Sequence, residues 1–279
     1  MTADSRASLD EIRDFHAKMM AAASNSSDER LEQAFRLVRR EAFMGPGPWQ
    51  IVVKGRHLET PSSDPAFLYQ NVLVSLDKSK GINNGEPFLH AAFLGAVAPQ
   101  PGEAVIQIGT GTGYYTAILS TLVAPGGHVH AVEVDEALAN RTRDNLASFE
   151  NASVICADAT ELELPQADLI YVSAGVVAPP ISWLQALRLG GRIIVPWQAN
   201  EKVGLAVLIT RAKQGFSARA LMPAYFIPCI GASDPMQTTK TPNGGEARSI
   251  QSVWLTRDRA PDETAVAIYR DLWFSNAGL

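Results

Sequence analysis

The chain has 279 residues, of which 46% are apolar and 19% charged, and its formal net charge is −5 at pH 7. This length suits one large domain with a full core, and the apolar fraction is too high for a disordered chain. Proteins that bind nucleic acid through its phosphates usually carry a basic excess, so we expect no nucleic-acid partner. Cys156 and Cys229 share no close spacing with each other, and the sequence predicts no metal site.

The N-terminal region gives no sign of a targeting segment. Its first twenty residues are charged throughout and lack the apolar stretch of a secretory signal. The apolar run 169–181 is interrupted by Ser173, Gly175 and two prolines, and it falls short of the roughly 18 residues that a membrane span needs. We therefore expect a cytoplasmic protein without a membrane partner. The sequence does not indicate an oligomeric state.

The first eighty residues begin with two helical patterns. Apolar residues recur with a helical period over 9–23 and again over 28–42. Ser27 and Asp28 are candidate caps for the second helix, and the glycines and prolines at 45–48 should end it. Beyond them the sequence carries turn signals but no clear period.

The central part of the chain alternates between two kinds of pattern. Short β-branched runs are followed by longer helical stretches, which predicts βαβ units and a parallel sheet that is covered on both faces. The crossovers should be right-handed. The predicted strands are 104–108, 128–134, 152–157, 168–174, 191–197 and 203–210, and the predicted helices are 88–98, 114–123, 136–149 and 179–188.

Beyond residue 210 the helical patterns become rare. Strands are expected over 217–230 and 249–257, a long polar loop over 231–247, and a short helix or closing strand over 262–274. We divide the chain into an N-terminal helical cap and lead-in (1–80), a core (81–230) and a C-terminal extension packed on the core (231–279).

The most informative motif is GTGTG at 109–113, which follows a strand and precedes a helix that starts at Tyr114. Glycine lets the backbone turn sharply and lets a ligand approach it, while a helix N-terminus favours an anionic group. A dinucleotide-binding loop places its third glycine three residues after the second, and Tyr114 stands there. The observed spacing favours S-adenosylmethionine. The candidate ligands in this loop are Gly109, Thr110, Gly111, Gly113 and Tyr114.

Acidic residues follow the next two strands. Glu133 ends the strand after the glycine loop, where a carboxylate can accept both ribose hydroxyls, with Asp135 as a local competitor. Asp158 lies just past the third strand and can meet an adenine amino group, with the backbone of Ala159 beside the ring. Ser173 follows the fourth strand and is a further candidate contact. Ligands of open α/β sheets bind at this edge.

Together these features resemble the protein-L-isoaspartate (D-aspartate) O-methyltransferases, from about residue 28 to about residue 230. AVIQIGTGTGYYTAIL resembles the family's VLEVGTGSGYQTAVL, and the segments REAF, YQNVLVSL, LRLGGRIIVPW and YFIPCIG match family segments in the same order. The resemblance implies an α/β, Rossmann-like class I methyltransferase fold: a mostly parallel, doubly wound sheet with an antiparallel strand, N-terminal helices and a β-rich C-terminal extension. It also implies S-adenosyl-L-methionine as cofactor, a carboxylate of a protein or peptide as acceptor, and a role in protein repair.

The same resemblance gives a place to GINNGEPFLHA at 81–91. It corresponds to the family loop GQTISAPHMHA, which lies over the methyl-acceptor site, and His90 falls on the second histidine. Asn83 stands on the threonine and Gly85 on the serine that the family places near the acceptor carboxylate, so both hydroxyls are replaced. We expect the amides of Asn83 and Asn84 to be able to donate hydrogen bonds to the acceptor instead.

A second departure from the family is Gln107, where a glutamate usually precedes the glycine loop. Gln107 can accept a hydrogen bond but carries no charge for the ammonium group of the cofactor. Methyl transfer to a carboxylate needs no general base, because the acceptor is already ionised at neutral pH. Catalysis would then depend on in-line positioning and exclusion of water. The candidate residues at the acceptor site are Asn83, Asn84, Gly85 and His90.

Several alternatives stay open from the sequence. His90 begins an apolar helix, and a buried or capping role competes with a catalytic one. The replaced hydroxyls also leave room for an adaptor that binds the cofactor without turnover. A third interpretation is a methyltransferase for another peptide or a small molecule, since the fold does not fix the acceptor.

Overall fold

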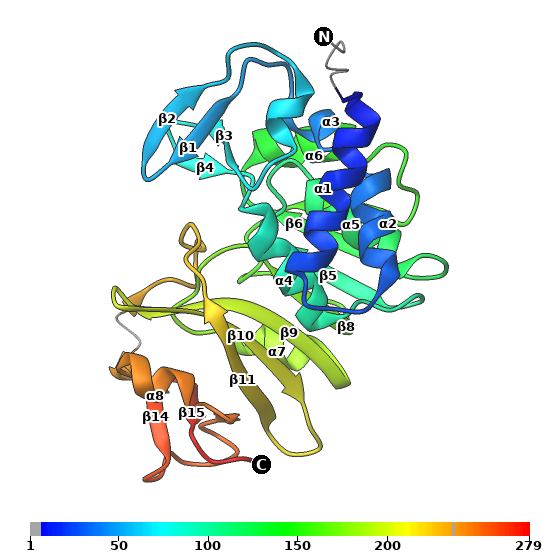
Figure 1. The fold of residues 1–279 in the computed structure, drawn as a ribbon. Coiled ribbons are helices and arrows are strands. Elements are labelled where there is room, and N and C mark those ends of the chain that lie inside the picture. Colours follow the sequence, from blue (N-terminus) through cyan, green and yellow to red (C-terminus); the bar gives the residue numbers. More distant parts are fainter. Residues whose placement is uncertain (1–6, 236–237) are drawn as a thin grey trace.

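The computed structural model describes residues 7–235 and 238–279 (Figure 1). A large twisted sheet runs through the molecule, with the N-terminal helices and a small four-stranded sheet towards one end and the C-terminal strands at the other. No helix in the described ranges is long and apolar enough to cross a membrane.

The large sheet joins eleven described strands in the order β12-β14-β15-β13-β11-β10-β9-β8-β5-β6-β7. The half from β7 to β9 is parallel, which confirms the predicted βαβ units. Val105 and Ile106 are neighbours in β5, so their side chains point to opposite faces of the sheet. Both are fully buried, which shows that both faces of this half are covered. The parallel strands are β5 (Ala104–Ile108), β6 (His128–Glu133), β7 (Ala152–Cys156), β8 (Ala167–Val172) and β9 (Leu187–Asn200).

The other half of the sheet is antiparallel. The expected Rossmann-like α/β class is confirmed, and the antiparallel part is larger than the one strand that we expected, because the C-terminal extension continues the same sheet. These strands are β10 (Val203–Arg211), β11 (Phe216–Pro223), β12 (Thr238–Lys240), β13 (Ser252–Leu255), β14 (Ala265–Tyr269) and β15 (Leu272–Ser275).

Three expectations for the C-terminal part are corrected. The strand expected over 217–230 ends at Pro223, which has no N–H to extend the ladder. The expected polar loop 231–247 contains β12 and a short helix, α8 (Gly244–Arg248), which Asn243 initiates with a capping box. Residues 262–274 form neither a helix nor one strand, because β14 and β15 pair as two antiparallel strands.

The N-terminal helices pack against the same apolar core as α4 and α5. The helix predicted over 9–23 is confirmed, whereas the one expected over 28–42 is interrupted at Val38, whose backbone is extended. Asp28 caps the first piece, and Ser27 does not. The break allows Arg40 to turn inwards, where it is fully buried. The described helices up to residue 200 are α1 (Leu9–Ala23), α2 (Glu29–Leu37), α3 (Glu41–Met44), α4 (Pro87–Val97), α5 (Tyr114–Val123), α6 (Glu136–Asn145) and α7 (Ile181–Ala186).

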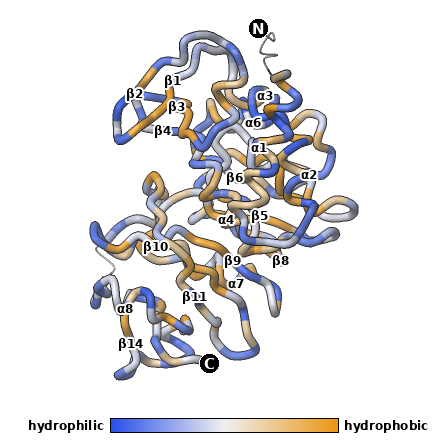
Figure 2. Tube along the Cα trace, in the orientation of Figure 1, coloured by the Kyte–Doolittle hydropathy of each residue, from blue (hydrophilic) through white to orange (hydrophobic). Residues whose placement is uncertain are grey.

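The large sheet separates two apolar cores. One contains residues of α1, α2, α4 and α5, and the other contains residues of α7 and the C-terminal strands. Figure 2 shows the apolar colour along the strands of the sheet and the polar colour mainly in the loops at their ends. Apolar packing on both faces therefore holds the sheet in place, and polar groups gather in the loops at the ends of its strands.

Residues 50–83 form a small sheet that the sequence did not indicate. Its strands lie in the order β2-β1-β3-β4, and a 3-10 turn (Pro65–Leu68) precedes β3. Ser75 of β3 pairs with Asn83 of β4 across the expected boundary between residues 80 and 81. The division into three parts stays a prediction. The strands are β1 (Gln50–Val53), β2 (Arg56–Glu59), β3 (Leu73–Asp77) and β4 (Ile82–Asn83).

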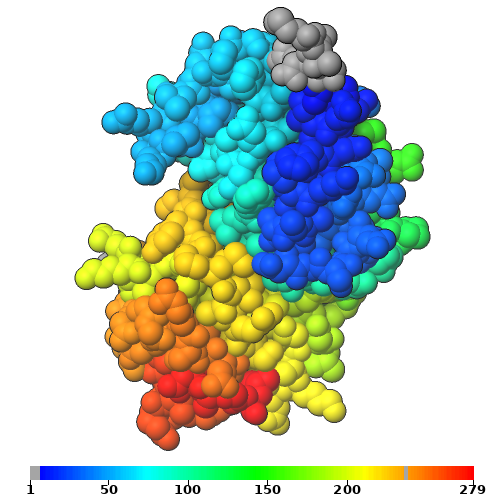
Figure 3. Space-filling model, viewed as in Figure 1, coloured from blue at the N-terminus to red at the C-terminus, as the bar shows by residue number. Residues whose placement is uncertain are grey.

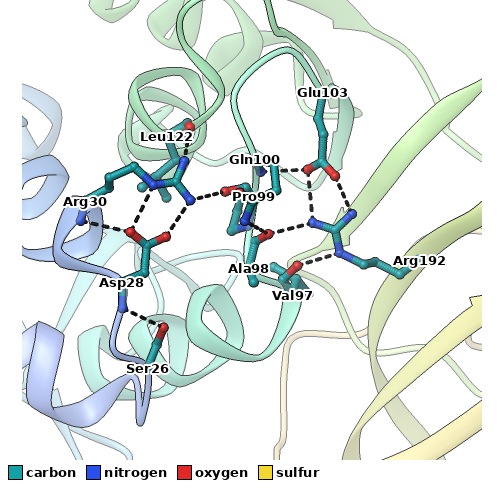
Figure 4. A network of polar contacts seen from close by, with 10 residues as sticks. All are labelled: Ser26, Asp28, Arg30, Val97, Ala98, Pro99, Gln100, Glu103, Leu122 and Arg192. Atoms are coloured by element: carbon teal, nitrogen blue, oxygen red, sulfur yellow. Dashed lines mark hydrogen bonds and ion pairs between the residues drawn. The ribbon is translucent and has the colours of Figure 1, made fainter.

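Two arginines hold the C-terminal end of α4 (Figure 4). Arg30 of α2 donates a hydrogen bond to the Pro99 carbonyl at 2.9 Å. Arg192 of β9 donates to the Ala98 carbonyl at 2.9 Å and pairs with Glu103 at 2.7 Å. Carbonyls at a helix C-terminus lack partners within the helix and carry partial negative charge, so both contacts stabilise α4. They fix the helix whose other end faces the site described next.

Candidate active site

A cavity of about 660 Å³ opens at the carboxyl ends of the parallel strands. Its walls come from the ends of β5 and β6, the segments after β7 and β8, the loop around β4, and the loop after β11. In Figure 3 the surface is hollowed on the left, between the small sheet in cyan and the gold segment after β11. All the site residues expected from the sequence line this cavity except Gly113.

The glycine turn has the backbone that its sequence predicted. Gly109, Gly111 and Gly113 have φ values of 77°, 58° and 87°, a region that other residues rarely adopt. Gly113 serves packing rather than the cavity wall, because a Cβ there would lie 3.0 Å from the Thr142 side chain. That close approach seats α6 beside the N-terminus of α5.

Glu133 ends β6 and is only 6% exposed. Its carboxylate accepts N–H groups from Gly111 at 2.8 Å, Val134 at 3.0 Å and Asp135 at 3.1 Å. Burial raises the pKa of Glu133, and these backbone donors oppose that rise. The acid therefore ties the glycine turn to the next strand while it faces the cavity.

Asp158 lies in a turn after β7. Its Oδ1 accepts the N–H and the hydroxyl of Thr160, both at 2.8 Å. The loop after β11 closes over this turn, since a Cβ on Gly231 would lie 3.0 Å from Asp158 Oδ2. Ala159 is buried beside it and accepts a hydrogen bond from Trp183 at 3.0 Å. Because β7 pairs with β6 and Cys156 lies beside Glu133, these residues form the part of the wall next to the end of β6.

Gln107 is almost fully buried at the end of β5. Its Oε1 accepts the Thr116 hydroxyl at 2.6 Å. The oxygen that we expected to serve a ligand therefore already anchors the first turns of α5.

At the opposite end of the cavity, Gly85 and His90 are sterically coupled. Gly85 has a φ of 77°, and a Cβ at this position would lie 2.2 Å from Nε2 of His90. No side chain fits there while the imidazole keeps its place. The missing hydroxyl at position 85 thus has a structural reason, which is the position of the ring.

His90 is 2% exposed and does not cap α4, because Glu86 holds the N-cap position. Its ring stacks on Tyr115 with 3.7 Å between centroids, and Nδ1 lies 2.9 Å from the Tyr171 hydroxyl. Burial, reinforced by the charge of Arg40, lowers the pKa of His90 to about 3. The imidazole is therefore neutral at physiological pH.

Five buried polar atoms of the cavity wall have no hydrogen-bond partner among the described residues. Buried polar groups are normally paired, so an unpaired cluster in one cavity requires an explanation. A polar ligand that occupies the cavity supplies one, and its size suits a nucleoside-containing cofactor. The five atoms are Nδ2 of Asn84, Oγ1 of Thr112, the hydroxyls of Tyr114 and Tyr115, and Oγ of Ser173.

Sequence reasoning missed several residues of this site. Tyr115 follows Tyr114 in α5 and also faces the cavity, and the loop from Tyr225 to Ile230 was expected as part of a strand. The prolines at 223 and 228 were the available signal against that strand. At the rim, Lys80 pairs with Asp135. Over the described ranges, no group of three or more His, Cys, Asp or Glu side chains is placed to hold a metal ion.

The doubly wound sheet, the glycine turn and the acids at the strand ends together define a class I methyltransferase that uses S-adenosyl-L-methionine. The family model described as Protein-L-isoaspartate(D-aspartate) O-methyltransferase matches residues 56–234. The chain belongs to this family.

Curated relatives agree with this assignment. A protein-L-isoaspartate O-methyltransferase of Ignicoccus hospitalis is 30% identical over 181 residues, which cover 63% of this chain and 84% of that protein. Protein-L-isoaspartate O-methyltransferase 1 of Cupriavidus necator is 26% identical over 80% of this chain and 81% of its own length.

Two solved structures share the fold. A protein-L-isoaspartate O-methyltransferase superimposes with a TM-score of 0.67 at 19% identity, over 95% of this chain and 88% of its own. The second structure is a Plasmodium falciparum protein described as a protein-L-isoaspartate O-methyltransferase, in complex with S-adenosyl-L-homocysteine. It superimposes with a TM-score of 0.62 at 19% identity, over 78% of this chain and 97% of that chain.

Proposed function

We propose that this chain transfers the methyl group of S-adenosyl-L-methionine to the free carboxylate of an isoaspartyl residue in a protein or peptide. The observation that carries the proposal is the acceptor end of the cavity, where the buried unpartnered atoms are neutral and the imidazole of His90 is uncharged. Glu86 also lines the cavity there, but it is exposed and its carboxylate accepts a hydrogen bond from Asn71. A carboxylate acceptor needs hydrogen-bond donors but no base, and this is what the wall offers. We place the reaction in the cytoplasm, without a nucleic-acid or membrane partner.

Three elements would hold the cofactor. Glu133 would accept the ribose hydroxyls, Asp158 would meet the adenine amino group, and the N-terminus of α5 at Tyr114 would face the amino-acid carboxylate. When bound, S-adenosyl-L-methionine supplies an electrophilic methyl group. The unpartnered Ser173 hydroxyl and the cavity volume support this fit.

The environment of His90 also favours a carboxylate over an alcohol as acceptor. Burial lowers the pKa of His90 to about 3, so its imidazole is a weak base. Nδ1 lies 2.9 Å from the Tyr171 hydroxyl, which also donates to the His90 carbonyl at 3.5 Å. An alcohol acceptor would need a general base, whereas an ionised carboxylate needs none.

A methyl-transfer assay tests the proposal. The chain is supplied with S-adenosyl-L-methionine labelled in the methyl group and with an isoaspartyl peptide, and its aspartyl twin serves as the control. We expect label on the isoaspartyl peptide alone, released by mild base as a methyl ester is. Cofactor binding without transfer to either peptide would favour the adaptor interpretation, and transfer to neither peptide but to a small carboxylic acid would redefine the acceptor.

A further inference from the structure

Arg40 is a buried cation without a carboxylate partner in the described part of the chain. It is 0% exposed, and its guanidinium donates to the carbonyls of Leu68 at 2.6 Å and Val72 at 2.8 Å. Glu41, the next residue, pairs instead with Arg13. Burying a charge without a carboxylate partner costs free energy. The presence of the Arg40 guanidinium here therefore suggests that its positive charge acts on a nearby group.

The remaining contact of this guanidinium leads to the cavity. Nη2 of Arg40 donates to Oδ1 of Asn84 at 3.3 Å, and the N–H of Val74 donates to the same oxygen at 3.0 Å. Two donors on one side of the amide fix which end is oxygen. The Asn84 amino group must therefore face the other way, where Nδ2 is buried and unpartnered in the cavity wall.

The surroundings of Nδ2 suit an anion. The hydroxyl of Tyr114 lines the same cavity without a partner, and the Arg40 guanidinium lies 5.9 Å from the Tyr114 ring centroid. In a buried, weakly screened region, a positive charge behind a row of donors favours a negative group in front of them.

We propose that Arg40 is a positioning residue, which holds the Asn84 amide so that Nδ2 donates to the acceptor carboxylate and which supplies the buried positive charge for that anion. This inference rests on the proposed function. It assigns Asn84, rather than Asn83, as the acceptor ligand, because Nδ2 of Asn84 is buried without a partner, whereas Asn83 is only half-buried and its Oδ1 holds the turn by accepting the Gly85 N–H at 3.0 Å.

Asn84→Asp is the sharpest test, because it keeps the oxygen that faces Arg40 and replaces the donor by a second anionic oxygen. We expect kcat/KM for the isoaspartyl peptide to fall about a hundredfold, mainly through KM, since a donor becomes a repelling charge. The affinity for S-adenosyl-L-homocysteine should stay within about twofold of wild type, and Tm should not fall, because Arg40 gains a carboxylate partner. Asn140→Asp, on the exposed face of α6, controls for one added charge.

A double-mutant cycle tests the part played by Arg40. Arg40→Lys keeps the charge but not the fixed fork of donors, so it should raise the acceptor KM about tenfold in the wild-type background and about twofold or less beside Asn84→Ala. Equal effects in both backgrounds would mean that Arg40 only supports the fold. A lower Tm for Asn84→Asp, or acceptor kinetics within about twofold of wild type, would overturn the proposal.

The proposed function can fail separately from this inference. A wild-type chain that binds S-adenosyl-L-homocysteine and the isoaspartyl peptide, yet transfers no methyl group, refutes the proposed function. Peptide affinity measured by calorimetry for wild type, Asn84→Asp and Asn140→Asp then gives the same comparison without turnover. Equal peptide affinity in all three would overturn the role of Asn84.

Discussion

The two ends of the cavity differ in how their polar groups are used. At the cofactor end, the Glu133 carboxylate and the Asp158 carboxylate already accept backbone and hydroxyl donors in the free protein. At the acceptor end, Asn84 and Tyr115 present buried atoms without partners. The two acids at the proposed cofactor end are thus preorganised by neighbouring donors, whereas the Asn84 amide and the Tyr115 hydroxyl at the proposed acceptor end are completed only by a ligand. Mutations at the proposed cofactor end should accordingly change stability and cofactor affinity, and mutations at the proposed acceptor end should change acceptor selectivity.

The largest effect is expected from Gly85→Ser, although it restores the hydroxyl that the family carries. The new Cβ would meet the His90 ring and adopt an unfavourable φ, and we expect a loss of about 3 kcal/mol of unfolding free energy. Denaturant unfolding measures this loss. Gly81→Ser is the matched control, because Gly81 has a φ of 67° and open space around it, so only the backbone strain of about 1 kcal/mol should appear.

Combining Gly85→Ser with His90→Ala separates the two causes. Removing the ring should recover most of the loss, because the residues are in contact and their effects do not add. If the double variant is as unstable as the sum of the single variants, the coupling between position 85 and the imidazole is wrong.

Glu133→Gln should weaken binding of S-adenosyl-L-homocysteine by about thirtyfold, which is about 2 kcal/mol, because a neutral amide accepts less strongly than a carboxylate. Wild-type affinity should also fall as the pH drops through the raised pKa of Glu133, since the protonated acid loses an acceptor. Calorimetry across this pH range checks both points. If Glu133→Gln binds S-adenosyl-L-homocysteine with the wild-type pH dependence, a group other than Glu133 causes that dependence.

A third prediction concerns His16, a fully buried residue of α1 that does not line the cavity. Burial lowers its pKa to about 3, as it does for His90. The unfolded chain binds the proton more tightly, so stability is lost as pH falls below about 6.5, by about 1 kcal/mol per histidine at pH 5.5. His16→Phe should reduce this acid sensitivity. Equal slopes of unfolding free energy against pH for both proteins would contradict the buried neutral ring.

The smallest effect is expected at the rim. Lys80 is more than half exposed and pairs with Asp135, so Lys80→Gln should change cofactor affinity and acceptor KM by less than about twofold, because exposed ion pairs contribute little. A larger change in KM would show that the rim takes part in acceptor selection. Comparison at low and high salt distinguishes an electrostatic from a steric cause.

The parallel half of the sheet was predictable, and the antiparallel half much less so. The strand at 104–108, the glycine turn and Glu133 follow one another at spacings that local backbone preferences enforce. The strands after residue 250 are only four or five residues long, so their periodicity was too weak to separate a helix from a hairpin. The sequence did not indicate Arg40 as a functional residue. Its proposed role depends on contacts with residues 68–84, and these contacts form only in the folded chain.

The two buried histidines add a caution to site prediction. His16 and His90 have the same lowered pKa for the same reason, but only His90 lines the cavity. A perturbed pKa indicates burial first and function second. What distinguishes His90 is its geometry, namely its contact with Gly85, its stacking on Tyr115 and its bond to the Tyr171 hydroxyl.

The turn at Asn83 has a consequence for how this chain ages. Asparagine followed by glycine deamidates readily, because the glycine nitrogen can attack the asparagine side chain and the ring that forms reopens largely to isoaspartate. In Asn84-Gly85 the attacking nitrogen donates its hydrogen to Asn83, and the Asn84 amide is clamped by Arg40 and Val74. The native fold thus restrains, within the proposed acceptor loop, the formation of isoaspartate, the residue after which its family is named. Unfolded or nicked copies lose that restraint, and old protein should accumulate the lesion at position 84 only where the clamp has opened.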